Sequence, residues 1–296
     1  MSTRAKVLLG LGLYVALIVV AVFVFGFARV DNEEFQPQNE FQLDTWFSIG
    51  PLPFNKASLY VIIAGVLTVG TMMYVADRMQ ARPNRVQTAV EVLYTLMRDN
   101  IAGENMDRAM LKKWFTFIGT IFLFIWFSNL IGYIPLPTNT EHTVDIFGVT
   151  VPSLALYAAT ANISVPLVLA LIVWVGFNVE GIRAKGLIGY IKSLVPAGVP
   201  GPMRPVILGL ELLSNFMRLI SLSVRLFANI LAGHLIILFM AGALVVLLGI
   251  EALGVVTLPM AIALFLFEVG LVATLQAFIF ATLTAIYLGE ATAESH

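Results

Sequence analysis

The sequence predicts an all-α membrane protein with five or six transmembrane helices and an amphipathic surface helix. Of the 296 residues, 59% are hydrophobic and 12% are charged, a balance that soluble globular domains do not show. Apolar runs long enough to cross a bilayer recur along the chain. Between Pro205 and Leu288 the sequence has only five charged residues, and its two apolar runs are longer than one upright span needs. The chain is therefore predicted to end in a long, strongly tilted helical hairpin.

The first element is an apolar run over 7–28. It is interpreted either as a membrane span that the protein keeps or as a signal peptide, because Gly26 and Ala28 resemble a small-x-small cleavage site. The run is longer than most signal-peptide cores, which favours a span. With the polar and acidic segment that follows, it forms the first predicted region, 1–56.

The second region, 57–205, is predicted to hold the peripheral transmembrane helices. Apolar runs over 57–76, 114–134 and 153–179 are each long enough for one span. Between the first two runs, apolar residues recur at helical spacing, which predicts an amphipathic helix over 84–101. Such a helix either lies on the membrane surface or is a solvated connection between two spans.

The charges of the loops predict how the chain is oriented. Segments 77–113 and 180–205 are basic, whereas 29–56 is acidic and 135–152 lacks lysine and arginine. The positive-inside rule assigns the basic segments to the cytoplasm and the other two to the outside. The C-terminus is therefore predicted to be cytoplasmic.

The third region, 206–296, is predicted to be a hairpin of two long helices with a short tail. A single helix over 206–248 would be about 63 Å long, against a hydrocarbon core of about 30 Å. It must break, protrude or tilt strongly. A steeply tilted hairpin would place Arg225 near the middle of the membrane.

Polar residues occur inside the apolar run of this hairpin, between Glu211 and His234. At about 100° per residue, a helix brings six of them into one stripe about 80° wide. His234 falls about 180° from Arg225, on the opposite side. Because an arginine inside a membrane costs about 2.5 kcal/mol or more to insert, a functional role is expected. The stripe consists of Glu211, Ser214, Arg218, Ser221, Arg225 and Asn229.

Structural interpretations of the same residues stay open. Arg225 could form a structural pair with Glu211 or with a lipid phosphate, and His234 could be a structural residue. Arg218 is expected either to anchor at the cytoplasmic interface or to pair with Glu211, two turns away. Three further polar residues of the spans could likewise have either a structural or a functional role: Asn129, Glu268 and Gln276.

Other classes of site are excluded by composition. The chain has no cysteine, which removes disulfides and thiolate metal sites. Its three histidines are too scattered for a metal centre, and no glycine-rich phosphate loop is present. No metal and no cofactor are therefore predicted, and a net charge of −1 gives no case for nucleic acid.

The segment Glu211–His234 resembles the most specific stretch of subunit a of the F-type rotary ATP synthases. The shared pattern reads Arg-x-x-Ser-Leu-x-x-Arg-Leu-x-x-Asn-x-x-Ala-Gly-His. The segment Leu275–Leu288 is similar to the C-terminal helix of that family, and Asn129–Gly132 before Pro135 is a less specific similarity. Order and spacing agree from about residue 57 to the end.

The resemblance implies roles for the polar stripe. Arg225 corresponds to the essential stator arginine, which faces the carboxylates of a ring of c subunits. Asn229 and Ser221 correspond to polar positions beside it. Glu211 and Ser214 correspond to positions on the side that leads to the catalytic head.

The resemblance also implies roles for the last helix, with two departures from the family pattern. Gln276 corresponds to the glutamine that neighbours the arginine, and Glu268 is the candidate partner of His234. That partner usually stands seven residues before the glutamine, about 20° from its face, whereas Glu268 stands eight before, about 80° away. Gly132 stands where some members carry an acidic residue.

The implied function is that of a non-catalytic, proton-translocating stator subunit, in which two offset half-channels load and unload the carboxylates of a c-ring. Implied partners are that ring, the peripheral-stalk b subunits, the lipid bilayer and, through the complex, the catalytic head. The implied location is a bacterial plasma membrane. The implied inlet path uses His234, Glu268 and Asn129, and the implied exit path uses Ser221, Ser214 and Glu211.

Two other functions would also suit a membrane chain with charges at mid-depth. One is an independent proton-coupled secondary transporter, which predicts inverted repeats; no pairing of the two halves of the sequence is visible. The other is a non-transporting assembly scaffold. The choice between proton and sodium stays open, because the selective carboxylate would lie on the c-ring.

Overall fold

The fold is taken from a computed structural model, which confirms the all-α membrane class. Five helices of the described chain are long and apolar enough to cross a membrane. The first predicted span, 7–28, lies outside the described residues apart from two single positions, and so does the link 241–253. The structure describes residues 16, 20, 45–50, 52–78, 85–103, 105–134, 144–146, 149–151, 158–196, 198–240 and 254–293.

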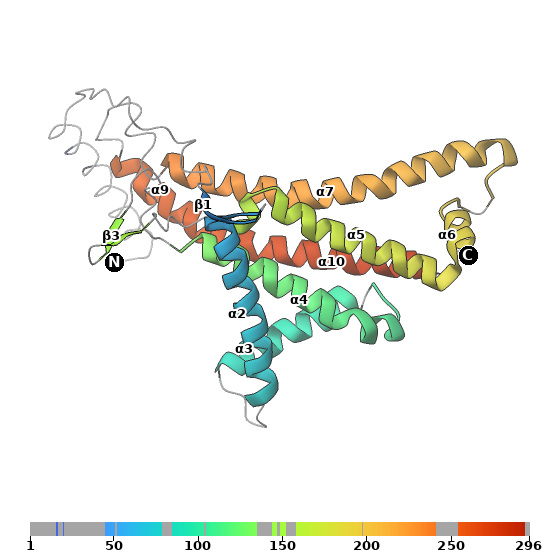
Figure 1. The fold of residues 1–296 in the computed structure, drawn as a ribbon, viewed down its shortest axis with the longest axis horizontal. Coiled ribbons are helices and arrows are strands. Elements are labelled where there is room, and N and C mark those ends of the chain that lie inside the picture. The colour runs from blue at the N-terminus through green and yellow to red at the C-terminus, as the bar shows by residue number, and fades with distance from the viewer. Residues whose placement is uncertain are drawn as a thin grey trace, which may run out of the picture.

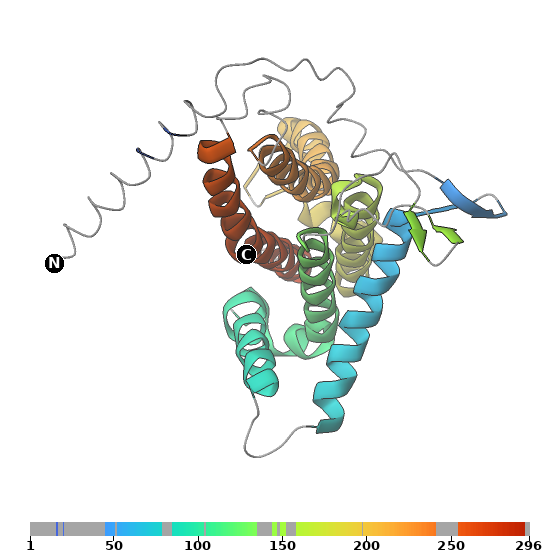
Figure 2. The same cartoon turned by 90° about the vertical axis from the view of Figure 1, so that its left-hand side faces the viewer.

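Helix α4 (Arg108–Gly132) lies at the centre of the bundle. Helix α10 (Ala273–Thr292) packs on one side of α4 and α2 (Lys56–Arg78) on the other, as the end-on view of Figure 2 shows. Helix α5 (Ser164–Lys185) packs against α10, and α7 (Arg204–Leu238) packs against α5. The core between them is apolar, and its largest fully buried side chains include Phe122, Ile118, Ile125, Leu226 and Leu288.

The spans do not share one direction. In Figure 1, α7, α5, α10 and α4 run along the long axis of the molecule, whereas α2 crosses them steeply. Helix α7 has 35 residues, which gives it a length of about 53 Å. A helix of that length, lying at a steep angle to another span, must be strongly tilted in a hydrocarbon core about 30 Å thick.

The second arm of the hairpin is a single long rod made of three consecutive helices. Helix α9 (Gly254–Phe267) continues as the π-helix η7 (Glu268–Val272) and then as α10. The apolar span within it covers Thr257–Thr292, which is 36 residues. The tilted C-terminal hairpin predicted from the sequence therefore has two long arms in the structure.

The predicted amphipathic helix is α3 (Arg85–Thr95), which continues as the π-helix η2 (Leu96–Ala102). The apolar residues that recur at helical spacing here form a stripe, Val86, Val90, Leu93, Met97 and Ile101. Met97 and Ile101 are buried, and η2 packs against α4 and α10. Tyr94, on another face, is exposed. The second half of the apolar stripe is therefore a packing surface on the protein itself.

The structure also has two short antiparallel hairpins that the sequence did not predict. Strand β1 (Thr45–Ile49) pairs with β2 (Leu52–Asn55), and β3 (Val144–Ile146) pairs with β4 (Val149–Val151). Gly50, between β1 and β2, has a φ of +63°, a conformation that glycine adopts at little cost. Both hairpins lie in the loops predicted to face outside, so the membrane part remains helical.

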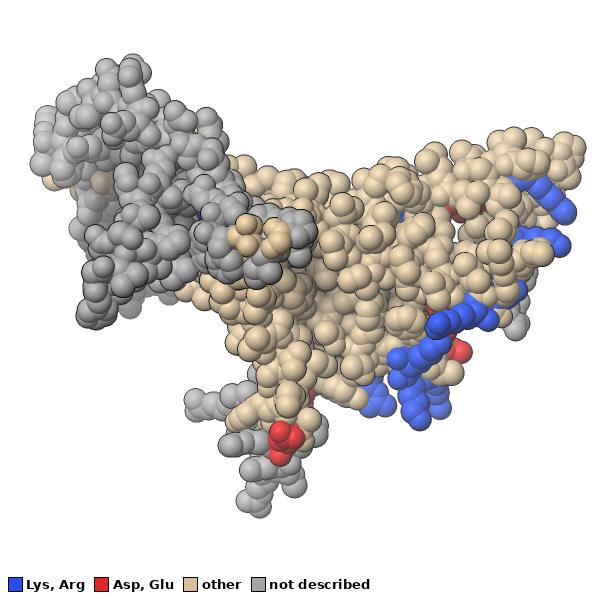
Figure 3. Space-filling view, in the orientation of Figure 1, with Lys and Arg blue, Asp and Glu red and all other residues tan. Residues whose placement is uncertain are grey.

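Basic side chains gather at the opposite end of the molecule, where α6 (Leu187–Ser193) and the C-terminus lie (Figures 1 and 3). There α4 and α7 begin and α5 ends. Inside this end, Lys113 forms an ion pair with Glu180, whose side chain is buried. The exposed basic residues of this end include Arg108, Lys112, Arg183, Lys192 and Arg204.

Candidate functional site

Arg225 lies in the middle part of α7, and its side chain is exposed on the surface of the bundle. It forms no hydrogen bond or ion pair with any other residue that the structure describes. The alternative of a structural pair with Glu211 is wrong, because the two residues lie about 21 Å apart along one helix. The guanidinium is therefore unpaired within the described chain.

The exposed face of α7 that carries Arg225 also carries Ser221 and Asn229. Another edge of the helix is buried and includes Leu226 and Ile230. These buried residues are centred about 110° from the polar stripe. The helix thus presents Ser221, Arg225 and Asn229 to the outside of this chain and packs against α5 with its buried edge.

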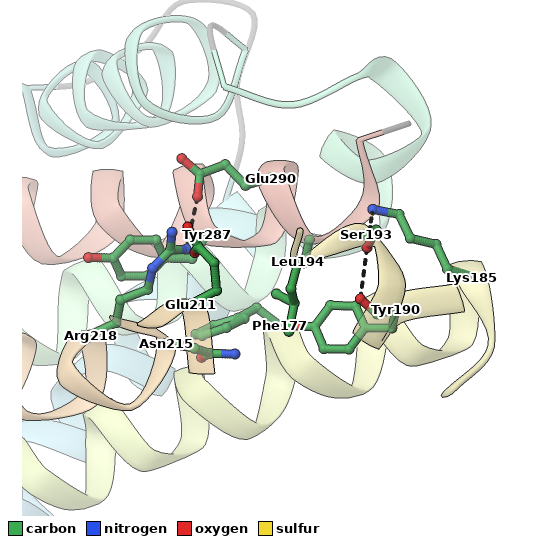
Figure 4. Close-up of a pocket in the computed structure, with 11 residues that line it drawn as sticks. Phe177, Lys185, Tyr190, Ser193, Leu194, Glu211, Asn215, Arg218, Tyr287 and Glu290 are labelled. Carbon is green, nitrogen blue, oxygen red and sulfur yellow. Dashed lines mark hydrogen bonds and ion pairs between the residues drawn. The ribbon is translucent and has the colours of Figure 1, made fainter. Parts of the chain in front are cut away.

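Toward the N-terminal end of α7, some residues of the polar stripe face a cavity and others face outward. Glu211 and Arg218 line a cavity of about 150 Å³ between α5, α6, α7 and α10 (Figure 4). Nη1 of Arg218 donates to Oε2 of Glu290 at 2.8 Å, and its guanidinium lies 4.7 Å from the centre of the Tyr287 ring. The partner of Arg218 is therefore Glu290 on α10, and of the two alternatives for Arg218 the pair with Glu211 is wrong. Ser214, one turn from Glu211, is exposed.

A network of hydrogen bonds near this cavity joins α5, α6 and α7. Oδ1 of Asn178 accepts hydrogen bonds from the hydroxyl of Tyr190 and from Nδ2 of Asn215, each at 2.9 Å. Nε1 of Trp174 donates to the main-chain oxygen of Asn215 at 3.0 Å. Burial raises the pKa of Tyr190, so the phenol stays neutral and keeps donating. Sequence reasoning missed Asn178 and Asn215, although Asn215 follows Ser214 in the polar segment.

At the other end of α7, His234 joins this helix to the end of α4. Its Nδ1 lies 2.9 Å from the main-chain oxygen of Ile230, and its Nε2 lies 3.0 Å from that of Gly132. Both ring nitrogens thus lie within hydrogen-bond distance of main-chain oxygens. A side chain at position 132 would collide with Ala158, so the acidic residue that some family members carry there has no room in this chain.

Glu268 begins the π-helix η7, and its carboxylate lies against Gly233. A Cβ atom at Gly233 would be 2.5 Å from Oε2 of Glu268, so the carboxylate occupies the space that a side chain would need. The backbone N–H of Ala273 bonds to the oxygen of Glu268, a π-type bond that holds one residue more than an α turn. Glu268 stands eight residues before Gln276 instead of the expected seven, and the extra residue in the π turn compensates for this difference. The carboxylate of Glu268 therefore lies against Gly233, which precedes His234 in the chain.

Tyr133, which sequence reasoning missed, contacts both of these ionisable side chains. Its hydroxyl donates to Oε2 of Glu268 at 3.0 Å, and its ring centre lies 4.5 Å from that of His234. In the described chain no direct hydrogen bond or ion pair joins His234 to Glu268. An aromatic residue at the end of a span is typical of the membrane interface, so its sequence position gave no sign of this contact.

Asn129 and Gln276 are both buried, whereas Arg225 is exposed. Oδ1 of Asn129 accepts a hydrogen bond from Thr160 at 2.7 Å, and its Nδ2 donates to the main-chain oxygen of Ala273 at 3.3 Å. The first bond ties α4 to the short helical turn Ala159–Ala161, and the second ties it to the start of α10. No hydrogen bond joins Gln276 to another described residue, Arg225 included. A part for either residue in a proton path stays a prediction.

The site as a whole has two polar groups at opposite ends of α7, with Arg225 between them. The first surrounds Glu211 and the cavity, and the second surrounds His234 and Glu268. Along the helix Glu211 lies about 21 Å and His234 about 13 Å from Arg225. Among the described residues, no group of three or more His, Asp or Glu side chains is placed to hold a metal ion.

Comparison with known proteins gives a consistent result. Residues 58–289 match the family model described as ATP synthase A chain. A protein named ATP synthase subunit a from Bradyrhizobium diazoefficiens is 34% identical, over 88% of this chain and 98% of the relative. The protein of that name from Maricaulis maris is 33% identical over 83% and 91%, and that from Rubrobacter xylanophilus is 34% identical over 80% and 83%.

Proposed function

Because the chain belongs to the ATP synthase A chain family, we propose that it forms two offset proton half-channels that load and unload the carboxylates of a rotating c-ring. The family makes it an integral membrane subunit of the ATP synthase complex, concerned with proton transport and ATP synthesis. In this proposal the chain is a stator and carries out no ATP chemistry itself.

The observation that carries the proposal is the exposed, unpaired guanidinium of Arg225 in a membrane span. A charge in this position is costly unless a partner satisfies it, and the described chain supplies none. A carboxylate on a neighbouring c-ring would be the complementary partner. The guanidinium keeps its charge at all relevant pH values and favours the ionised form of such a carboxylate.

The two polar groups would then have separate tasks. A proton would arrive from outside through the region of His234 and Glu268 and protonate a c-ring carboxylate. After rotation the carboxylate would meet Arg225 and release its proton toward Ser221, Ser214 and the cavity at Glu211. The positive charge of Arg225 would also repel a proton that hopped directly between the paths. A proton crossing 100 mV releases about 2.3 kcal/mol, so several must pass for each ATP.

The remaining partners and the orientation follow from charge and family. The basic end of the molecule (Figure 3) supports a cytoplasmic location for the C-terminus in a bacterial plasma membrane. The lipid bilayer would surround the exposed apolar faces of α2 and α5. Peripheral-stalk b subunits would hold the chain against the c-ring and connect it to the catalytic head.

Reconstitution of the chain with and without a c-ring tests this function against an independent transporter. Vesicles that contain both components should take up protons when a potassium-diffusion potential is imposed, whereas vesicles with the chain alone should not. A pH-sensitive dye inside the vesicles measures the uptake. Equal uptake by the chain alone would contradict the proposal and favour a transporter, and no uptake by chain and c-ring together would favour a scaffold.

A further inference from the structure

Tyr133 lies where the end of α4 meets both arms of the C-terminal hairpin. It follows Gly132 directly, and 4% of its surface is exposed. Its ring is stacked at a tilt of 31° on that of His234 from α7, and Phe265 of α9 lies edge-on at 6.3 Å. Its hydroxyl donates to Glu268. No other described residue is joined by a hydrogen bond or ring contact to both His234 and Glu268.

Tyr133 links the two ionisable groups through different atoms, since its ring contacts His234 and its hydroxyl bonds to Glu268. Both nitrogens of His234 are occupied by main-chain oxygens of Ile230 and Gly132. Oε2 of Glu268 lies over Gly233, which has no side chain that could hold it. The geometry of the Glu268 carboxylate therefore depends on the donor from Tyr133.

We propose that Tyr133 is a positioning residue of the inlet half-channel, which fixes the Glu268 carboxylate next to His234; this inference rests on the proposed function. The tyrosine hydroxyl donates its proton to the carboxylate and has lone pairs free to accept from water. Tyr133 thus sets the position of the carboxylate to which an incoming proton would pass.

Tyr133→Phe is the sharpest test, because it removes the hydroxyl and keeps the ring that stacks on His234. Tyr94→Phe is the matched control, since Tyr94 is exposed and its hydroxyl bonds to no described residue. ATP synthesis is measured in vesicles with the whole complex, at a fixed membrane potential and a fixed pH on the side of the catalytic head, while the pH on the side of the inlet is varied. Rates are normalised to the amount of assembled complex.

Tyr133→Phe should assemble normally and lower the maximal rate about tenfold, the loss expected for a hydrogen bond to a charged group. The pH on the inlet side at half-maximal rate should shift from the wild-type value, because the carboxylate then lacks its hydroxyl donor. Among the described residues, Tyr133 at the end of α4 bonds directly to Glu268, and His234 on α7 stacks on the Tyr133 ring. Tyr94→Phe should match the wild type.

Three outcomes would overturn the inference: an unchanged rate, a lower rate with an unchanged half-maximal pH, or a failure to assemble. The last two would make the role of Tyr133 purely structural. The proposed function is judged separately, by proton uptake of the wild-type chain with the c-ring. If that uptake is present while Tyr133→Phe behaves as the wild type, the positioning role alone fails.

Discussion

Replacing Arg225 by alanine is expected to abolish coupled proton pumping and ATP synthesis. Two unit charges about 4 Å apart attract by about 4 kcal/mol at an effective dielectric constant of about 20, so the loss should be about a thousandfold. The complex should still assemble, because Arg225 is exposed and forms no hydrogen bond or ion pair within the described chain. ATP-driven quenching of a pH-sensitive dye in vesicles measures the effect.

Arg225→Lys should fail as well, because a desolvated lysine can lose its proton whereas a guanidinium cannot. Arg218→Ala is the matched control on the same helix. Its ion pair with Glu290 is partly exposed, with side-chain exposures of 32% and 54%, and such pairs contribute at most about 1 kcal/mol. Pumping by Arg218→Ala should therefore fall less than about fivefold. Coupled pumping by Arg225→Ala, or an equal loss in both variants, would contradict this account.

Exchanging Glu268 and Val269 is expected to close the inlet path. The double variant Glu268→Val with Val269→Glu moves the carboxylate by one residue, about 100° around the helix. It would then lie away from Gly233 and from the hydroxyl of Tyr133. Loss of a positioned acid–base group lowers rates by about a hundredfold or more, and ATP synthesis by vesicles measures it.

Deletion of Gly270 tests the same π turn in the opposite way, because it removes the extra residue and should keep the direction of the Glu268 side chain. The deletion shortens the π-helix by one residue, so a regular α turn would hold Glu268 seven residues before Gln276. Gly270 is exposed, and no neighbouring atom lies within 4 Å of where its Cβ would be, so little packing is lost. The deletion should keep near wild-type activity. An active exchange variant together with an inactive deletion would show that the π turn does not set the direction of Glu268.

The helices of the membrane part could be predicted from the sequence because each of them is a long apolar run. The polar stripe of α7 was predictable for the same kind of reason, since a regular helix fixes the phases of Ser221, Arg225 and Asn229. Their exposure could not be predicted. It depends on which edge of α7 packs against α5, a property of the assembled bundle.

The parts of the site that could not be predicted depend on contacts between distant segments. The partner of Arg218 is Glu290, 72 residues later, and helical phase alone favoured Glu211. The π turn at Glu268 breaks the constant angle per residue on which any phase calculation relies. Tyr133 stands in the sequence as an ordinary aromatic residue at the end of a span, and its role follows from the approach of α7 and η7.

Cysteine cross-linking tests most directly whether Arg225 faces a c-ring. The chain has no cysteine of its own, so each bond formed is unambiguous. Ala228→Cys places a thiol on the exposed face of α7, less than one turn from Arg225, and Ile172→Cys places one on the exposed face of α5. With a single cysteine beside the c-ring carboxylate, oxidation should join the c subunit to position 228 and not to position 172. Absence of the bond at 228, or equal bonding at both, would contradict the claim that Arg225 opposes a rotor.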